Sequence, residues 1–429
     1  MTSLLEIRIV SPVLIGVFCA TSLVVLGYLL WRPRRSRWPL QAALAFAIGG
    51  ALALAVALVA DATGAFGIAL PWQVKAWAAA GLGATAVAIR NLWGARWWRR
   101  VIASTAAVLF LVTTTLGINA HFGLNATLAN FLHIQIDKPI AIPTASPGAW
   151  DPSVPLSQSW QPPSDMPAKG TQGTVSIPAT KSGFSARQAG LYIPPAGLTA
   201  NPPLLPLVIM MMGQPGDPDP QYIAAALDAA AAKNKGLAPY VLVVDQLGDP
   251  TRDPACADSA MYGNVETYVT QDVVDFARTL PVIPSAQDWV IAGYSNGGGC
   301  AFTYAAKHPD IWGNLLSISG EIVPGSEHPD ETIADVYGGS AQAYKAAQPM
   351  SILASGTVAY PNEWALFTAG ENDPDYVAQA QAGAAAAVAA GWDAQSYIVP
   401  GAGHVIDALE GGLAEGFSRL YPRLGLAPS

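Results

Sequence analysis

Charged residues are scarce in this sequence. Only 12% of its 429 residues are Asp, Glu, Lys or Arg, against about 25% in ordinary soluble domains. The few charges are unevenly placed: residues 1–120 carry ten Lys or Arg and two Asp or Glu, a net charge of +8, and residues 121–429 carry twelve and twenty-eight, a net charge of −16. The larger part therefore lacks the basic footprint of a nucleic-acid-binding protein, and we expect no nucleic acid partner.

Cysteine and histidine are also few, with three and five residues respectively. The cysteines are Cys19, Cys256 and Cys300, and they form neither a C-x-x-C motif nor a cluster with histidine. Such spacings mark the common zinc sites, so their absence predicts a protein without a bound metal. We expect no other cofactor.

The apolar residues that replace the missing charges gather near the N-terminus. Residues 9–31 contain no charge, and about 20 such residues span a membrane. Residues 39–60 and 101–120 are similar, while residues 74–93 are a weaker candidate because Lys75 and Arg90 lie near the ends. Lysine and arginine at such positions can reach the membrane interface.

Two basic loops set the predicted topology. The loop "RPRRSR" at residues 32–37 and the loop "RNLWGARWWRR" at residues 90–100 carry four arginines each. Positively charged loops stay in the cytoplasm, so the chain must cross the membrane an even number of times between them. This requires the weaker segment to span, which predicts four transmembrane helices within residues 1–120 and everything beyond them outside the cytoplasm. Ionisable residues are rare inside these segments, which favours an anchor over a transporter.

The rest of the chain divides into a spacer and a folded domain. Residues 121–169 are rich in proline and serine without a helical period, which is typical of an extended linker. Strand and helix patterns then alternate through residues 170–429, and the run "LPLVIMMM" at residues 205–212 reads as a strand buried on both faces. This alternation predicts an α/β domain with a mostly parallel sheet and helices on both faces.

One glycine-rich stretch in this domain points to chemistry. "AGYSNGGG" contains a G-x-S-x-G motif centred on Ser295, between the strand pattern "DWVIAG" and a helix pattern. A nucleophilic serine on a sharp strand-to-helix turn requires this setting. The start of the following helix also favours a developing negative charge. We therefore predict that Ser295 is a nucleophile.

The serine needs a base and an acid. His404 follows the last strand pattern on a glycine-rich turn and satisfies the chain order Ser, Asp or Glu, His; His328, in a polar stretch, is a second candidate. The preceding strand ends in "AGENDPD", where Asp373 is our first choice as the acid, ahead of Glu371 and Asp375. The acid would orient the imidazole and stabilise its cation.

The oxyanion hole would use two backbone amides. One belongs to Asn296, the residue after the nucleophile. The other comes from the stretch "MMMGQPGDP", where Gln214 is the preferred donor and Met212 the alternative, since Pro215 has no N–H.

These stretches, with "CADSAMYGN" and "GAGHV", resemble the α/β-hydrolase superfamily over residues 170–429. Within it the chain is similar to the esterase group that includes esterase D and the mycolyltransferases of mycolate-bearing actinobacteria, and above all to multi-span, membrane-anchored members. Many relatives have His-Gly where this chain has Met212-Gly213, although the backbone amide is retained. The resemblance implies serine-ester chemistry, with hydrolysis or acyl transfer of a membrane or cell-wall ester such as a lipid, glycolipid or aminoacyl-lipid.

The predicted location bears on the cysteines. An extracytoplasmic compartment permits disulfides, and Cys300 lies five residues after Ser295 while Cys256 lies in a loop near the expected site. We hypothesise a disulfide between them; the alternative is two buried thiols. For the whole chain the competing hypothesis is a non-catalytic scaffold, or a cell-wall-binding protein, that kept the hydrolase fold.

Overall fold

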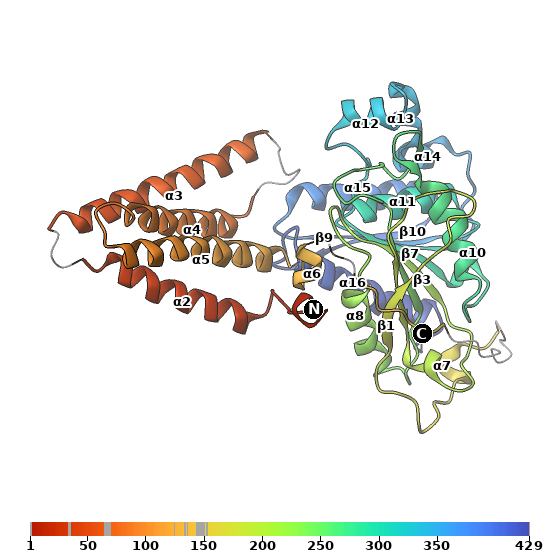
Figure 1. The fold of residues 1–429 in the computed structure, drawn as a ribbon. Coiled ribbons are helices and arrows are strands. Elements are labelled where there is room, and N and C mark those ends of the chain that lie inside the picture. The colour runs from red at the N-terminus through yellow and green to blue at the C-terminus, as the bar shows by residue number, and fades with distance from the viewer. Residues whose placement is uncertain are drawn as a thin grey trace. The chain divides into compact units, whose positions relative to one another are not determined.

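The computed structural model describes residues 2–32, 36–63, 70–123, 125–132, 134, 136–142, 151 and 153–428. It divides into two compact units, Met1–Ile136 and Asp137–Ser429 (Figure 1). Arg34 and Arg35 of the first basic loop and residues 143–150 of the predicted linker lie outside the described residues.

The first unit is helical. Its helices are α1 (Thr2–Leu5), α2 (Pro12–Leu30), α3 (Trp38–Thr63), α4 (Trp72–Arg90), α5 (Trp97–Phe122) and α6 (Leu128–Phe131). Among the described residues, three helices are long and apolar enough to cross a membrane: α2, α3 and α5, with mean hydropathies of 2.4, 2.5 and 2.1.

The prediction of four such helices is therefore one too many by length and composition. Helix α4 forms where it was expected, but alanine and glycine dilute its apolar character and Lys75 and Arg90 add charge. Both charges are satisfied within the unit: Lys75 pairs with Asp61 at 2.5 Å, and Arg90 donates to the Gln41 side chain at 2.8 Å. Glycines in α4 also bring the helix close to its neighbours, since a Cβ on Gly81 would collide with the side chain of Thr114 in α5.

The second unit is built on one eight-stranded sheet. Its strands are β1 (Thr171–Val175), β2 (Ala189–Ile193), β3 (Leu207–Met211), β4 (Tyr240–Val244), β7 (Trp289–Tyr294), β8 (Asn314–Ile318), β9 (Trp364–Gly370) and β10 (Asp393–Val399). Their order is β1-β2-β4-β3-β7-β8-β9-β10, and all neighbours from β4 to β10 are parallel, while β1–β2 and β2–β4 are antiparallel. A separate two-stranded ribbon pairs β5 (Asp258–Ser259) with β6 (Gly263–Asn264).

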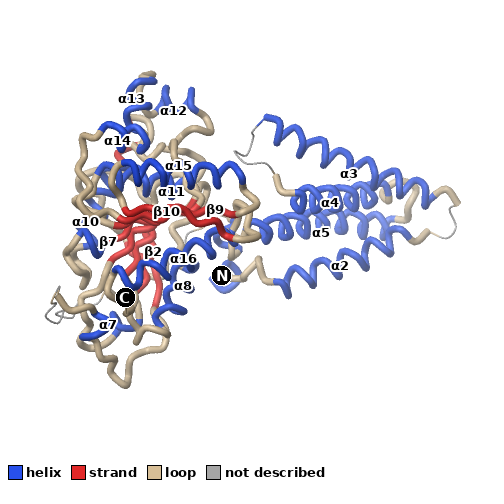
Figure 2. Tube along the Cα trace, turned by 180° about the vertical axis from the view of Figure 1, so that it is seen from behind, coloured by secondary structure: helices blue, strands red, loops and turns tan. Residues whose placement is uncertain are grey.

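Helices cover both faces of this sheet. The longer ones are α8 (Gln221–Ala231), α11 (Asn296–Lys307), α15 (Pro374–Ala389) and α16 (Ile406–Arg423). Figures 1 and 2 show α11 and α15 over one face and α8 and α16 over the other. Every residue of β3, β4, β7 and β8 is buried, as expected for parallel strands covered on both sides. The predicted α/β-hydrolase architecture is confirmed.

Shorter helical segments complete the second unit: α7 (Leu156–Ser159), α9 (Val265–Thr267), a π-helical turn (Tyr268–Asp272), α10 (Val273–Ala277), α12 (Pro329–Asp335), α13 (Ala341–Ala347) and α14 (Pro349–Ser355). Single 3₁₀ turns occupy Pro195–Leu198 and Ala286–Asp288. Helices α12 to α14 occupy the polar stretch that separates β8 from β9.

The second unit begins inside the segment that was predicted as a linker. The Thr174 amide of β1 donates to the Lys138 carbonyl at 2.7 Å, and the Lys138 amide donates to the Thr174 hydroxyl at 2.9 Å. Farther along, the Trp160 indole donates to the Lys235 carbonyl at 3.0 Å. These described parts of the segment are thus packed on the second unit, because their backbone and indole groups find partners there.

Candidate active site

Ser295 lies on a sharp turn between β7 and α11. Its backbone has φ 53° and ψ −121°. This conformation is unfavourable for any residue that has a side chain, so the turn is strained. The turn is held by hydrogen bonds from the Ser295 amide to the Ile318 carbonyl at 2.9 Å and from the Gly298 amide to the Ser295 carbonyl at 2.8 Å. A Cβ on Gly293 would collide with the Gly297 backbone, so the turn cannot close around larger residues.

The three residues predicted to form a triad are brought together. Ser295 Oγ lies 2.9 Å from His404 Nε2, and His404 Nδ1 lies 2.7 Å from Asp373 Oδ2. The His404 and Asp373 side chains are each 12% exposed, so the pair is largely shielded from water. The arrangement can accept a proton from the serine hydroxyl at Nε2 while the carboxylate holds Nδ1–H.

The structure distinguishes between the three candidate acids. Asp373 is the residue before α15, and its side chain makes no capping bond to that helix, which leaves the carboxylate for His404. Glu371 instead accepts a hydrogen bond from the Gly401 amide at 2.8 Å, within the loop that leads to His404. Asp375 is exposed in the first turn of α15. The second base candidate, His328, is exposed before α12.

Two tyrosines that the sequence analysis missed flank the imidazole. The Tyr376 ring lies 4.1 Å from the His404 ring, centroid to centroid, and the Tyr294 ring stacks at 5.6 Å. Burial raises the pKa of Tyr376, while a hydrogen bond with Ser295 acts in the opposite direction. The sequence positions of both tyrosines could have indicated this. Tyr294 is part of the G-x-S-x-G motif, and Tyr376 follows Asp373 by three residues, which is about one helical turn.

Both oxyanion candidates adjoin the nucleophile. Asn296 is the first residue of α11, directly after Ser295. A Cβ on Gly213 would lie 3.2 Å from the Ser295 Cβ, so the chain passes the serine immediately before Gln214. Met212, the alternative donor, is buried.

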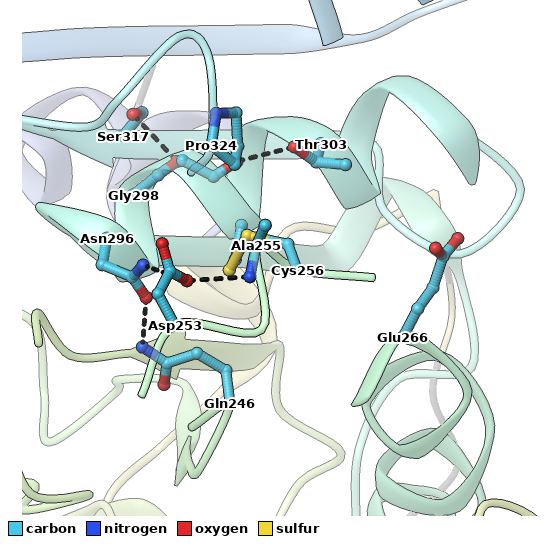
Figure 3. Close-up of a disulfide and its surroundings, with 12 residues drawn as sticks. Gln246, Asp253, Ala255, Cys256, Glu266, Asn296, Gly298, Thr303, Ser317 and Pro324 are labelled. Atoms are coloured by element: carbon cyan, nitrogen blue, oxygen red, sulfur yellow. Dashed lines mark hydrogen bonds between the residues drawn. A yellow bond between two sulfur atoms is a disulfide. The ribbon is translucent and has the colours of Figure 1, made fainter. Parts of the chain in front are cut away.

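The hypothesised disulfide is present. Cys256 and Cys300 are bonded, with their Cα atoms 5.1 Å apart. The bond joins the loop that contains Asp253 to α11, one turn beyond the nucleophile (Figure 3). Asp253 Oδ1 accepts hydrogen bonds from the Ala255 amide at 2.8 Å and the Asn296 side chain at 3.0 Å. The third cysteine, Cys19 in α2, is free.

Three acids that the sequence analysis did not anticipate lie near this end of α11: Glu321 is buried, Asp253 is half-buried and Glu327 is exposed. Burial, together with the negative charges of Asp253 and Glu327, raises the pKa of Glu321 to about 8. Burial likewise raises the pKa values of Asp253 and Glu327. One carboxyl oxygen of Glu321 has no hydrogen-bond partner. Within the described part of the chain, no group of three or more His, Cys, Asp or Glu is arranged to hold a metal ion.

Comparison with known proteins agrees with this geometry. Residues 201–408 match the model of the family described as "Putative esterase". An uncharacterized protein of Corynebacterium glutamicum is 33% identical over 292 residues, which make up 65% of this chain and 66% of that protein.

Three solved esterases are similar at lower identity. A ferulic acid esterase is 17% identical and covers 60% of this chain and 98% of its own, with a TM-score of 0.48. An S-formylglutathione hydrolase of Agrobacterium tumefaciens is 17% identical over 61% and 98% of the two chains, with a TM-score of 0.47. The enterobactin esterase of Shigella flexneri is 17% identical over 63% of each chain, with a TM-score of 0.41.

The disulfide should be measurable in two ways. Thiol titration of the unfolded, unreduced protein should find one reactive cysteine per chain, Cys19, and three after reduction. Replacing Cys256 and Cys300 together by serine should lower the free energy of unfolding of the second unit by up to about 4 kcal/mol, because the bond closes a loop of 44 residues. Three reactive thiols before reduction would contradict the bond.

Glu321 should make stability depend on pH. Its folded pKa of about 8 lies above the ordinary value of 4.5, so the folded state holds a proton that the unfolded state releases. The stabilisation is complete below pH 4.5 and is lost as the pH rises toward 8, by at most about 1.4 kcal/mol per pH unit. Glu321→Gln should therefore match wild type near pH 4.5 and exceed it in urea unfolding at pH 8. Equal stability of the two proteins at both pH values would refute this.

Proposed function

We propose that this chain, whose residues 201–408 match the "Putative esterase" family, is a serine hydrolase of carboxylic esters that works through an acyl-enzyme on Ser295. The observation that supports this most directly is the hydrogen-bonded series Ser295–His404–Asp373, placed on a strand-to-helix turn. A scaffold that had lost its chemistry would have no need to keep three polar side chains aligned at such a strained position.

The first half of the reaction forms the acyl-enzyme. Ser295 Oγ attacks the ester carbonyl carbon while His404 Nε2 takes the hydroxyl proton, and Asp373 stabilises the imidazolium. The backbone amides of Gln214 and Asn296 face the carbonyl oxygen as it becomes negative. The tetrahedral intermediate then collapses, the bond to the alcohol oxygen breaks, and that oxygen leaves with the proton from His404.

The second half removes the acyl group. Water, or a sugar or lipid hydroxyl, gives its proton to His404 and attacks the acyl carbon, and Ser295 leaves with that proton restored. With water the product is a carboxylic acid, and with another hydroxyl it is a new ester. Both outcomes use the same residues, so the acceptor decides between hydrolysis and acyl transfer.

We further propose that the active site faces outward from a membrane and acts on a lipid, glycolipid or aminoacyl-lipid ester of the envelope. Support comes from the three apolar helices, from the arginine-rich loop just before α5, which favours a cytoplasmic side, and from the disulfide, which suits an oxidising compartment.

Covalent labelling tests the chemistry. A fluorophosphonate should label the detergent-solubilised full chain, and Ser295→Ala should abolish the labelling because the probe reacts with the activated hydroxyl. Asp373→Asn should slow it by roughly 10³–10⁴-fold, since the wrong imidazole tautomer is then favoured. Glu371→Gln, the matched control, should stay within about threefold. Labelling that persists in Ser295→Ala, or none in folded wild type, would support the non-catalytic scaffold instead.

A reporter fusion tests the orientation. Alkaline phosphatase, which is active only outside the cytoplasm, should be active when fused after Ser429 and also when fused after residue 136. The same reporter placed in the basic loop near Gly94 should be silent, because the arginines hold that loop inside. Activity at Gly94 with silence at Ser429 would reverse the proposed topology.

A further inference from the structure

Two side-chain amides, those of Gln246 and Asn296, form a continuous hydrogen-bonded series. The series links the loop after β3 to the first turn of α11, which begins directly after Ser295. Gln246, in the loop after β4, donates from Nε2 to the Met212 carbonyl at 2.6 Å and to Asn296 Oδ1 at 3.1 Å. Asn296 Nδ2 in turn donates to Asp253 Oδ1 at 3.0 Å. Figure 3 shows Gln246, Asn296 and Asp253 in this order. Gln246 and Asn296 are each only 3% exposed.

The direction of each hydrogen bond is determined by the ends of the series. The Met212 carbonyl can only accept, so the Gln246 atom that faces it must be the amide nitrogen. That nitrogen carries two hydrogens, and the second points to Asn296, whose facing atom must then be the oxygen. The remaining Asn296 nitrogen meets an acceptor, the Asp253 carboxyl group. Neither amide can be flipped without opposing two donors or two acceptors.

The two groups joined in this way are the parts of the proposed oxyanion hole. Met212 lies two residues before Gln214, the first amide donor, and Asn296 supplies the second donor from its own backbone. The segments also touch directly, because a Cβ on Gly297 would collide with the Met211 and Met212 carbonyls. Gln246 therefore sets the spacing between a loop after β3 and the first turn of α11.

Resting on the proposed esterase function, we propose that Gln246 is a positioning residue that couples the two halves of the oxyanion hole. Its side chain donates to the Met212 carbonyl and to Asn296, whereas Ser295 pairs with His404. Its effect passes through Met212 and Asn296. The disulfide at Cys256 anchors the far end, since Asp253 lies three residues before it.

A device of this kind acts on the transition state. Oxyanion donors strengthen their contact only when the carbonyl oxygen becomes charged, so misplacing them lowers the chemical rate and leaves ground-state binding almost unchanged. Losing one donor outright costs about 10²–10³ in rate. Losing its positioning should cost less, roughly 10–100-fold.

The experiment uses the full chain in detergent and a fluorophosphonate probe, whose labelling is separated into a binding constant KI and a maximal rate kinact. Gln246→Met removes both donors at similar volume and should lower kinact 10–100-fold with KI within threefold. The matched control is Gln348→Met, a buried glutamine whose side-chain amide donates to the Pro324 carbonyl at 3.4 Å. It should keep kinact within threefold.

A second arm tests whether the residues act as one series. Asp253→Ala should also lower kinact, and the double variant should fall no further than Gln246→Met alone, because residues in one network are not additive. If Gln246→Met does not fold, Gln246→Glu replaces it: at low pH the neutral carboxyl can donate one hydrogen bond to Met212. The ratio of its kinact to that of wild type should then rise as the pH falls from 8 to 5.5.

The outcomes separate the two proposals. Unlabelled, folded wild type would end the esterase proposal before any Gln246 variant is measured. Labelled wild type with an unchanged kinact in Gln246→Met, or a loss in KI alone, would overturn only the positioning role. Fully additive losses in the double variant, or a kinact ratio for Gln246→Glu that stays flat with pH, would also overturn it.

Discussion

The strained turn at Ser295 is the constraint on which the rest of the site depends. A serine with φ 53° is held only because its surroundings leave no relaxed alternative. The Ile318 carbonyl of β8 binds its amide, and the glycines on either side let backbone from β3 and α11 approach to contact distance. The same turn starts α11, so the hydroxyl and the positive end of a helix are delivered together.

Parallel strands explain how the other residues reach this turn. Strands β3, β7, β9 and β10 run in the same direction, so the segments that follow them emerge at one edge of the sheet. Gln214, Ser295, Asp373 and His404 each follow one of these strands within a few residues. The sheet thereby gathers groups that are separated by up to 190 positions in the chain, and the disulfide and the Gln246 series fasten the loops between them.

The features that could be predicted are those with a local pattern. Alternating strand and helix patterns led to the correct architecture, and the motif around Ser295 identified the turn. The predicted number of membrane-spanning helices was one too high. Helix α4 was counted because the positions of the two basic loops required another crossing, but its sequence is rich in alanine and glycine and is less apolar than the other three helices. The packed parts of the presumed linker, such as Trp160, were not foreseen, because a single half-buried indole leaves no periodic signal.

The sequence by itself pointed to Ser295 as the candidate nucleophile, to His404 as its candidate base and to the kind of fold, since a motif between a strand and a helix and a histidine after the last strand are local facts. Only the tertiary structure decided which of three neighbouring acids meets the imidazole. Glu371 turns to the Gly401 amide, while Asp373 makes no capping bond and reaches His404. It also placed Tyr376, Glu321 and Gln246 around the site. The roles of these residues depend on contacts with partners on other segments, and those contacts form only once the chain has folded.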